Sequence, residues 1–118
     1  YNTNMNDALK ITTLISDIVK VINDFFGIKL DDESLHYSRL ITHLKFLSQR
    51  LFLNETIEDT DDTLVDIITS RYKKEFECSL KVKEYIEANY EHKVSKEELA
   101  YLAVHIRRVS MCTEGLEV

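Results

Sequence analysis

The scarcity of residues that break helices is the feature that most restricts how this chain can fold. Its 118 residues include no proline and only two glycines. Sandwiches and barrels depend on many tight turns, which proline and glycine usually supply, so these folds are disfavoured. Hydrophobic residues make up 44% of the sequence, which is enough for the core of an ordinary globular domain. The chain is therefore expected to form a few long helices.

Apolar residues recur at steps of three and four in the first half of the chain, which is the spacing of a helix that packs one face on a core. The first predicted helix runs from about Asn6 to Phe26 and ends at Gly27, where a left-handed residue belongs. The second begins within the segment 31–34, which offers an N-cap, and fades near residues 53–54. The inward-facing residues predicted for these two helices are Ala8, Ile11, Ile15, Ile18, Ile22, Phe25, Phe26, Leu40, Leu44, Leu47 and Leu51.

The second half of the chain predicts three further helical segments. The polar stretch 55–62 indicates a surface loop, and Thr60 or Asp61 can cap a short helix. A longer helix follows over about 71–90, either separated from the short one near Ser70 or continuous with it through a bend. Ser95 opens a capping box for the last helix, which ends near Cys112. The apolar and small residues assigned to these helices are Leu64, Val65, Ile67 and Ile68 in the short one, Phe76, Ser79, Leu80, Val82, Ile86 and Tyr90 in the next, and Leu99, Leu102, Ala103, Ile106 and Val109 in the last.

These segments together predict an all-α fold, a compact helical bundle of about five helices, four long and one short. No linker or internal repeat divides the chain, so residues 1–118 are expected to form a single domain. The chain begins with Tyr1 rather than with methionine, which suggests that it is a segment of a longer protein.

The charge and the cysteines limit the functions that this domain can have. A formal net charge of −6 argues against a direct grip on a nucleic-acid backbone, which needs a cationic surface. Cys78 and Cys112 lie far apart and lack metal-ligand spacing, so reduced thiols in a cytosolic protein are expected. Since no apolar run is long enough to cross a bilayer and no signal peptide is evident, we expect a cytoplasmic protein without membrane insertion.

Two histidines, His43 and His105, lie at the edges of the apolar stripes of two different helices. Arg39 precedes His43 by one helical turn, Arg108 follows His105 by about one turn, and Tyr101 lies one turn before His105. A histidine that titrates near neutral pH can accept a phosphoryl group on a ring nitrogen. A guanidinium group nearby can bind the oxygens of the product. The pattern therefore indicates two candidate phosphoryl acceptors, each with an arginine within reach.

Other interpretations of these histidines stay open at this point. A histidine at the edge of an apolar face is most often a partly buried structural side chain. Two histidines alone are too few for a zinc site, and although His36 could be a third ligand, we expect no metal. His92 falls between two predicted helices and is expected to serve only in loop solvation or capping. No Gly-rich phosphate loop is present, and no cofactor is expected.

Two longer runs of residues carry a more specific signal. The run His36–Leu51, HYSRLITHLKFLSQRL, closely resembles the histidine-bearing helix of a PTS regulation domain (PRD), the regulatory module of bacterial transcription antiterminators of the BglG/SacY/LicT type. The run Glu98–Val109, ELAYLAVHIRRV, is similar to the second histidine helix of that domain. The resemblance covers nearly the whole chain and is nearer to the second of two tandem PRDs than to the first. Arg107 departs from the pattern, because many relatives carry an acidic residue there, and this leaves the electrostatics around His105 open.

The resemblance implies a function as well as a fold. Members carry an N-terminal RNA-binding domain, absent here, followed by two PRDs whose phosphorylatable histidines would correspond to His43 and His105. In the second PRD, phosphoryl transfer from the phosphocarrier HPr generally activates the protein and favours a homodimer that prevents transcription termination. The sugar-specific enzyme II of the phosphotransferase system generally controls the first PRD. The domain would thus be a substrate of phosphotransfer and not an enzyme.

On this basis, Arg39 and Arg108 are expected to stabilise the phosphorylated histidines or to orient the acceptor rings, with Tyr101 beside them. The two histidines are expected to lie near one another at a surface or a dimer interface. Two alternative functions remain at this level: a PRD of a DNA-binding activator of sugar operons, or a histidine phosphocarrier component that passes its phosphoryl group on.

Overall fold

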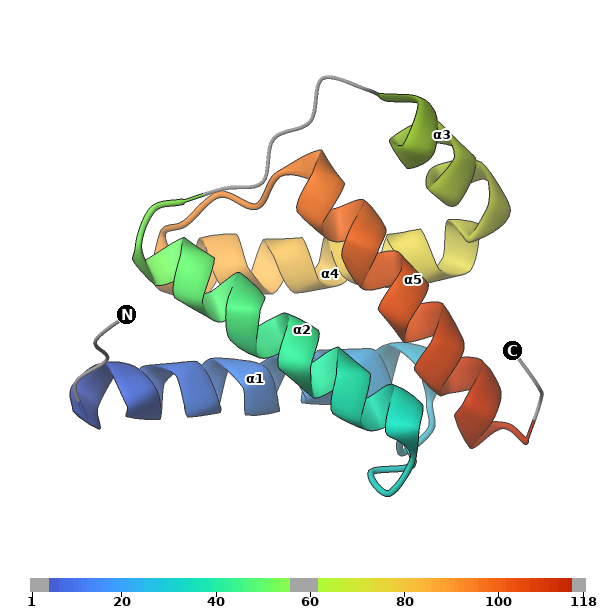
Figure 1. Cartoon of the computed structure of the whole chain (residues 1–118), viewed down its shortest axis with the longest axis horizontal. Helices are drawn as coiled ribbons and strands as arrows, with labels where there is room; N and C mark the ends of the chain where they lie inside the picture. Colours follow the sequence, from blue (N-terminus) through green and yellow to red (C-terminus); the bar gives the residue numbers. More distant parts are fainter. Residues whose placement is uncertain (1–4, 56–61, 116–118) are drawn as a thin grey trace.

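A computed structural model of the chain describes residues 5–55 and 62–115, and these residues form five α-helices without any strand (Figure 1). The prediction of an all-α fold with four long helices and one short helix is confirmed. The helices are α1 (Met5–Phe26), α2 (Leu35–Phe52), α3 (Asp62–Arg71), α4 (Lys73–Tyr90) and α5 (Lys96–Thr113).

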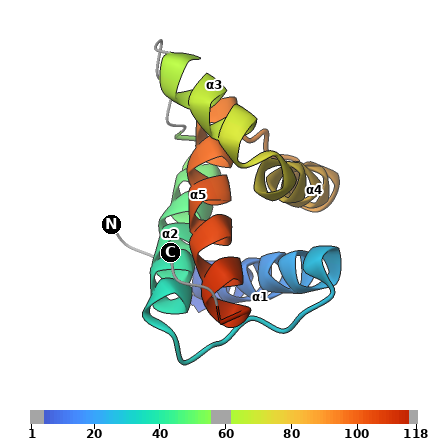
Figure 2. The same cartoon turned by 90° about the vertical axis from the view of Figure 1, so that its right-hand side faces the viewer.

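The helices are arranged in two layers with a small addition at one end. Figures 1 and 2 show α2 and α5 side by side and running in opposite directions, with α1 and α4 behind them. Helix α5 contacts α2, α3 and α4, whereas α1 contacts α2 and α4. Helix α3 lies at the end of the molecule where α5 begins, against α4 and α5 (Figure 1). Helix α5 is therefore the element on which most of the bundle packs.

The main hydrophobic core fills the space between α1, α2, α4 and α5. A separate, smaller cluster joins α3 to α5 through Val65, Ile68, Ala100 and Ala103. The buried residues of the main core are Leu14, Ile18, Ile22, Leu30, Leu40, Leu44, Leu47, Leu51, Cys78, Val82, Ile86, Val94, Leu99, Leu102, Ile106 and Val109.

The local signals at the helix ends are confirmed at three places. The Ser34 hydroxyl accepts a hydrogen bond from the Tyr37 N–H and caps α2. The Ser95 hydroxyl accepts one from the Glu98 N–H and caps α5. Gly27 follows α1 with φ +67°, a conformation that costs glycine little because it has no Cβ. Short polar side chains and a glycine thus set these boundaries as the sequence predicts.

Several predictions about the core and the loops need correction. Ala8 and Leu80 were expected to face inward but are exposed, and Leu14 and Cys78 are fully buried instead. Leu80 lies two residues from both Cys78 and Val82, which places it on the opposite side of α4. The helices α3 and α4 are separate, because Tyr72 interrupts the helical backbone with φ −118° and ψ 55°. The cap expected at Thr60 or Asp61 lies outside the described residues.

Both cysteines are free thiols, as expected. Burial, followed by the negative charge of Glu75, raises the pKa of Cys78 to about 12, so this thiol stays protonated at neutral pH. Among the helices that the structure describes, none has the length and apolar character required to traverse a bilayer.

Candidate functional site

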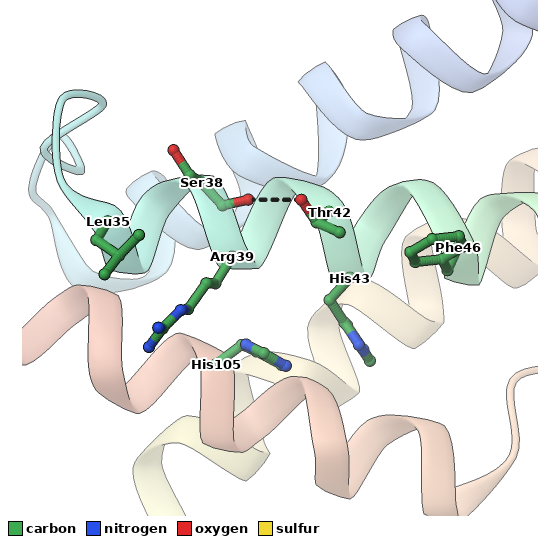
Figure 3. A pocket seen from close by; sticks show the side chains of 7 residues that line it. All are labelled: Leu35, Ser38, Arg39, Thr42, His43, Phe46 and His105. Atoms are coloured by element: carbon green, nitrogen blue, oxygen red, sulfur yellow. Dashed lines mark hydrogen bonds between the residues drawn. The ribbon is translucent and has the colours of Figure 1, made fainter.

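His43 of α2 and His105 of α5 meet where these two helices pack together. Their ring centroids are 4.6 Å apart and the ring planes are inclined by 28°, so the two imidazoles are stacked (Figure 3). Both side chains are half-buried, as expected for the edges of two apolar stripes. The prediction that these histidines lie near one another is confirmed.

Both histidines are disposed to be neutral at physiological pH. Burial, followed by the neighbouring His105 ring and the positive charge of the Arg50 guanidinium, lowers the pKa of His43 to about 4. Burial also lowers the pKa of His105, with contributions from the positive charges of Arg108 and Arg39. A neutral imidazole has a free electron pair on one ring nitrogen and can act as a nucleophile. The stack is therefore held in the protonation state that a phosphoryl acceptor needs.

One nitrogen of the stack lacks a hydrogen-bond partner. The Nε2 atom of His43 is buried and makes no hydrogen bond within the described parts of the chain. Buried polar atoms are normally paired, so such an atom is unusual among the described residues. The same holds for Nδ1 of His36, which lies seven residues earlier on α2.

Two hollows in the surface open beside the histidine stack. One has a volume of about 510 Å³ and the other about 410 Å³. Both are lined by His43, His105 and the exposed ring of Phe46. The larger one is also lined by Leu35, Ser38, Arg39 and Thr42 (Figure 3), and the smaller one by Arg50, Leu64, Ile68, Tyr101 and Val104. The histidine pair is therefore accessible from the surface through two openings.

Arg108 acts on the histidine that its one-turn spacing predicts, whereas Arg39 acts on the other one. Arg39 projects from α2 toward α5 (Figure 3), and its charge lowers the pKa of His105 on the opposite helix. Arg108 is exposed and acts on His105 of its own helix. The arginine whose charge acts on His43 is Arg50, two turns further along α2. Helical spacing alone cannot show that Arg39 acts on His105, because this depends on how α2 and α5 are packed.

Arg50 is held by a carboxylate from the other helix. Its Nε lies 2.7 Å from Oε2 of Glu98, and its Nη2 lies 2.8 Å from Oε1. The Glu98 side chain is only 2% exposed. Arg50 and Glu98 are 48 positions apart, and nothing in the sequence indicates that they are paired.

The remaining candidate residues separate into those at the site and those elsewhere. Tyr101 lines the smaller hollow with both histidines, as its position suggested. His92 packs edge-on against Phe52 with ring centroids 5.9 Å apart, so it has a packing role that was not expected. In the parts of the chain that the structure describes, no group of three or more His, Cys, Asp or Glu side chains could hold a metal ion.

Arg107 points away from the histidine stack despite its position beside it in the sequence. Its Nη1 lies 3.5 Å from Oε2 of Glu75 on α4, and its guanidinium carbon lies 5.3 Å from the ring centroid of Tyr72. The departure from the family pattern at this position therefore affects the contact between α4 and α5. The charges that act on His105 are those of Arg108 and Arg39 instead.

Comparison with known proteins gives a consistent result. A family model described as PRD domain matches residues 16–109. Transcription antiterminator LicT of Bacillus subtilis is 43% identical over 108 residues, which are 92% of this chain and 39% of LicT. The beta-glucoside operon antiterminator of Dickeya chrysanthemi is 30% identical over 108 residues, 92% of this chain and 38% of that protein. Protein GlcT of Staphylococcus aureus is 33% identical over 98 residues, 80% of this chain and 34% of GlcT. The chain thus spans less than two-fifths of the length of each of these relatives.

Proposed function

The chain belongs to the PRD domain family, and from that premise we propose that it is a regulatory domain in which His43 and His105 accept phosphoryl groups. The observation that carries this proposal is the stacked pair of half-buried histidines, contributed by α2 and α5 and reached from the surface through two hollows. Their lowered pKa values support it, because the neutral ring is the nucleophilic form.

The expected consequence of phosphorylation is a change in packing between α2 and α5. A phosphoryl group adds nearly two negative charges and three acceptor oxygens. The new N–P bond lies in the plane of the imidazole, so the group extends past the edge of the stacked rings, whose centroids are 4.6 Å apart, and its charge acts on both helices. Arg39 and Arg108, whose charges act on His105, are proposed to stabilise the phosphorylated form of that histidine. Tyr101 lines the smaller hollow beside both histidines and is proposed to help orient the rings.

The names of the relatives suggest the protein in which this domain works. LicT and the beta-glucoside operon protein are antiterminators. We propose that residues 1–118 are one regulatory domain of a cytoplasmic antiterminator of a sugar-utilisation operon, and that RNA is bound by another part of that protein. The phosphoryl donors are proposed to be HPr and a sugar-specific enzyme II, and the output is proposed to be a change in homodimer formation. The domain receives phosphoryl groups and is not itself an enzyme.

Intact mass measurement after incubation with enzyme I, HPr and phosphoenolpyruvate tests the proposal. The wild-type domain is expected to gain acid-labile additions of one phosphoryl mass each. These additions should disappear stepwise in His43→Ala and His105→Ala, whereas His92→Ala, which changes a histidine away from the stack, should retain them all. Absence of any addition to the wild-type domain, under conditions that phosphorylate HPr, would refute the proposal.

A further inference from the structure

The ion pair between Arg50 and Glu98 is short, bidentate and largely buried. Two parallel hydrogen bonds of 2.7 and 2.8 Å join the two side chains across the α2–α5 contact. Glu98 is 2% exposed and Arg50 is 23% exposed, so both groups are largely shielded from water. A bidentate pair of this kind fixes the plane of the guanidinium as well as its position. The Arg50 side chain is therefore held in one orientation before any ligand is present.

That orientation places Arg50 beside His43. The two residues are seven positions apart on α2 and so lie on the same face of the helix. Side chains in helices lean toward the N-terminus, which here is the direction of His43. Arg50 also lines the smaller hollow together with both histidines. The guanidinium consequently borders the space into which a phosphoryl group on His43 can project.

Glu98 leaves part of the guanidinium available for a second acceptor. Arginine has five N–H donors, and Glu98 engages one on Nε and one on Nη2. The other three, on Nη1 and Nη2, form the edge of the group that commonly binds two oxygens of a phosphate. One arginine can thus keep its buried carboxylate partner and still bind a phosphoryl group.

We propose that Arg50 is the residue that binds the phosphoryl group on His43, and that Glu98 is a positioning residue that acts through Arg50. This inference rests on the proposed function and refines it, since it assigns a different arginine to each histidine. Arg39, which the one-turn spacing assigns to His43, acts on His105 instead.

The phosphorylation step itself can be examined with a small donor, potassium phosphoramidate, which does not depend on docking of a protein. The unprotonated ring nitrogen of His43 supplies the electron pair of the new N–P bond. The P–N bond of phosphoramidate breaks, its nitrogen leaves as ammonia, and the other ring nitrogen of His43 keeps its proton. The domain is labelled in a His105→Gln background, so that the stacked partner cannot take the label.

The readout is the pH midpoint at which the ³¹P resonance of phosphorylated His43 shifts. A bound guanidinium favours the dianionic form of the phosphoryl group and lowers this midpoint. Arg50→Gln combined with Glu98→Gln removes the cation without leaving a buried carboxylate unpaired. This double variant is expected to raise the midpoint by roughly one pH unit, a factor of about ten in the ionisation equilibrium. Arg50→Lys keeps the positive charge but loses the planar pair of N–H donors that can bind two oxygens, so it should raise the midpoint by less.

Two further variants and a check of folding make the test decisive. Glu98→Gln alone should change the midpoint by less than the double variant does, because the guanidinium is still present. Arg71→Gln, which removes an exposed arginine from α3, should leave the midpoint unchanged. Circular dichroism at each pH confirms that the variants are folded.

The proposal would be overturned if the double variant titrated like the parent, or if Arg39→Gln raised the midpoint more than the double variant did. Either outcome is separable from failure of the proposed function. That function fails only if HPr leaves His43 and His105 unmodified, and phosphoramidate labelling does not depend on HPr.

Discussion

Helix α5 packs against α2 on one side and against α4 on the other, and the polar groups of the two contacts differ in geometry and in their neighbours. Each contains one arginine bound to one buried carboxylate. At the α2–α5 contact, Arg50 and Glu98 form two short hydrogen bonds beside two stacked histidines. At the α4–α5 contact, Arg107 lies 3.5 Å from Glu75 and above the ring of Tyr72.

The difference shows which contact can respond to modification. The α2–α5 contact holds two imidazoles that can be protonated or phosphorylated, and it carries two hollows that admit a reagent. The cluster around Arg107 at the α4–α5 contact combines an arginine, a carboxylate and a phenol, and it contains no imidazole. The rest of that contact belongs to the fully buried core, including Val82, Ile86 and Leu102. The face of α5 that contacts α2 is therefore suited to respond to modification, whereas the face that contacts α4 is suited to stay packed.

The largest expected difference between the two contacts is in the loss of stability when each arginine is removed. Arg50→Ala leaves Glu98 buried without its cation, and breaking a buried pair in this way typically costs 3–5 kcal/mol. Because Arg50 is partly exposed, we expect a decrease of about 3 kcal/mol in the free energy of unfolding, measured by urea denaturation. A decrease below about 1 kcal/mol would show that water enters to solvate Glu98.

Acid should weaken the α2–α5 contact selectively. The pKa of His43 is about 4 in the folded chain and about 6.5 when unfolded, so its contribution to stability is complete above pH 6.5 and is lost as the pH falls toward 4. At pH 5 this single histidine should lower the free energy of unfolding by about 2 kcal/mol relative to pH 7.5. His43→Gln should remove that part of the pH dependence, whereas His92→Gln should retain it. Equal pH profiles for wild type and His43→Gln would contradict the expectation.

The corresponding change at the α4–α5 contact should be smaller. Arg107 is 36% exposed and its bond to Glu75 is longer and single, so Arg107→Ala is expected to cost about 1 kcal/mol. The same urea titrations measure it, and Arg107→Lys should recover part of the loss. A loss as large as that of Arg50→Ala would mean that the two contacts do not differ in strength.

An ion pair outside both contacts provides the smallest effect. Lys81 and Glu84 lie 3.6 Å apart on α4 with side chains 60% and 70% exposed. Water and salt screen such a pair, so Glu84→Ala should change the free energy of unfolding by less than about 0.5 kcal/mol. A clearly larger change would show that surface electrostatics contribute to the values obtained for Arg50 and Arg107.

Much of this architecture can be predicted from the sequence because it depends on neighbours along the chain. The step of three and four between apolar residues gives α1, α2 and α5 with their buried faces. Ser34, Ser95 and Gly27 mark helix ends through bonds and conformations that involve only a few adjacent residues. The same periodicity places His43 and His105 at the edges of the core. These features were determined by the sequence alone.

Only the tertiary structure decides which side chains from different helices meet. Arg50 and Glu98 are 48 positions apart, and the stack of His43 on His105 likewise joins two separate helices. Their contact depends on the angle and the relative shift at which α2 and α5 pack, and these are fixed by the interlocking of the whole buried core. The sequence therefore determined that two histidines lie at the core edge with arginines nearby. The packing determined that the histidines face each other and that Arg39 acts on the ring of the opposite helix.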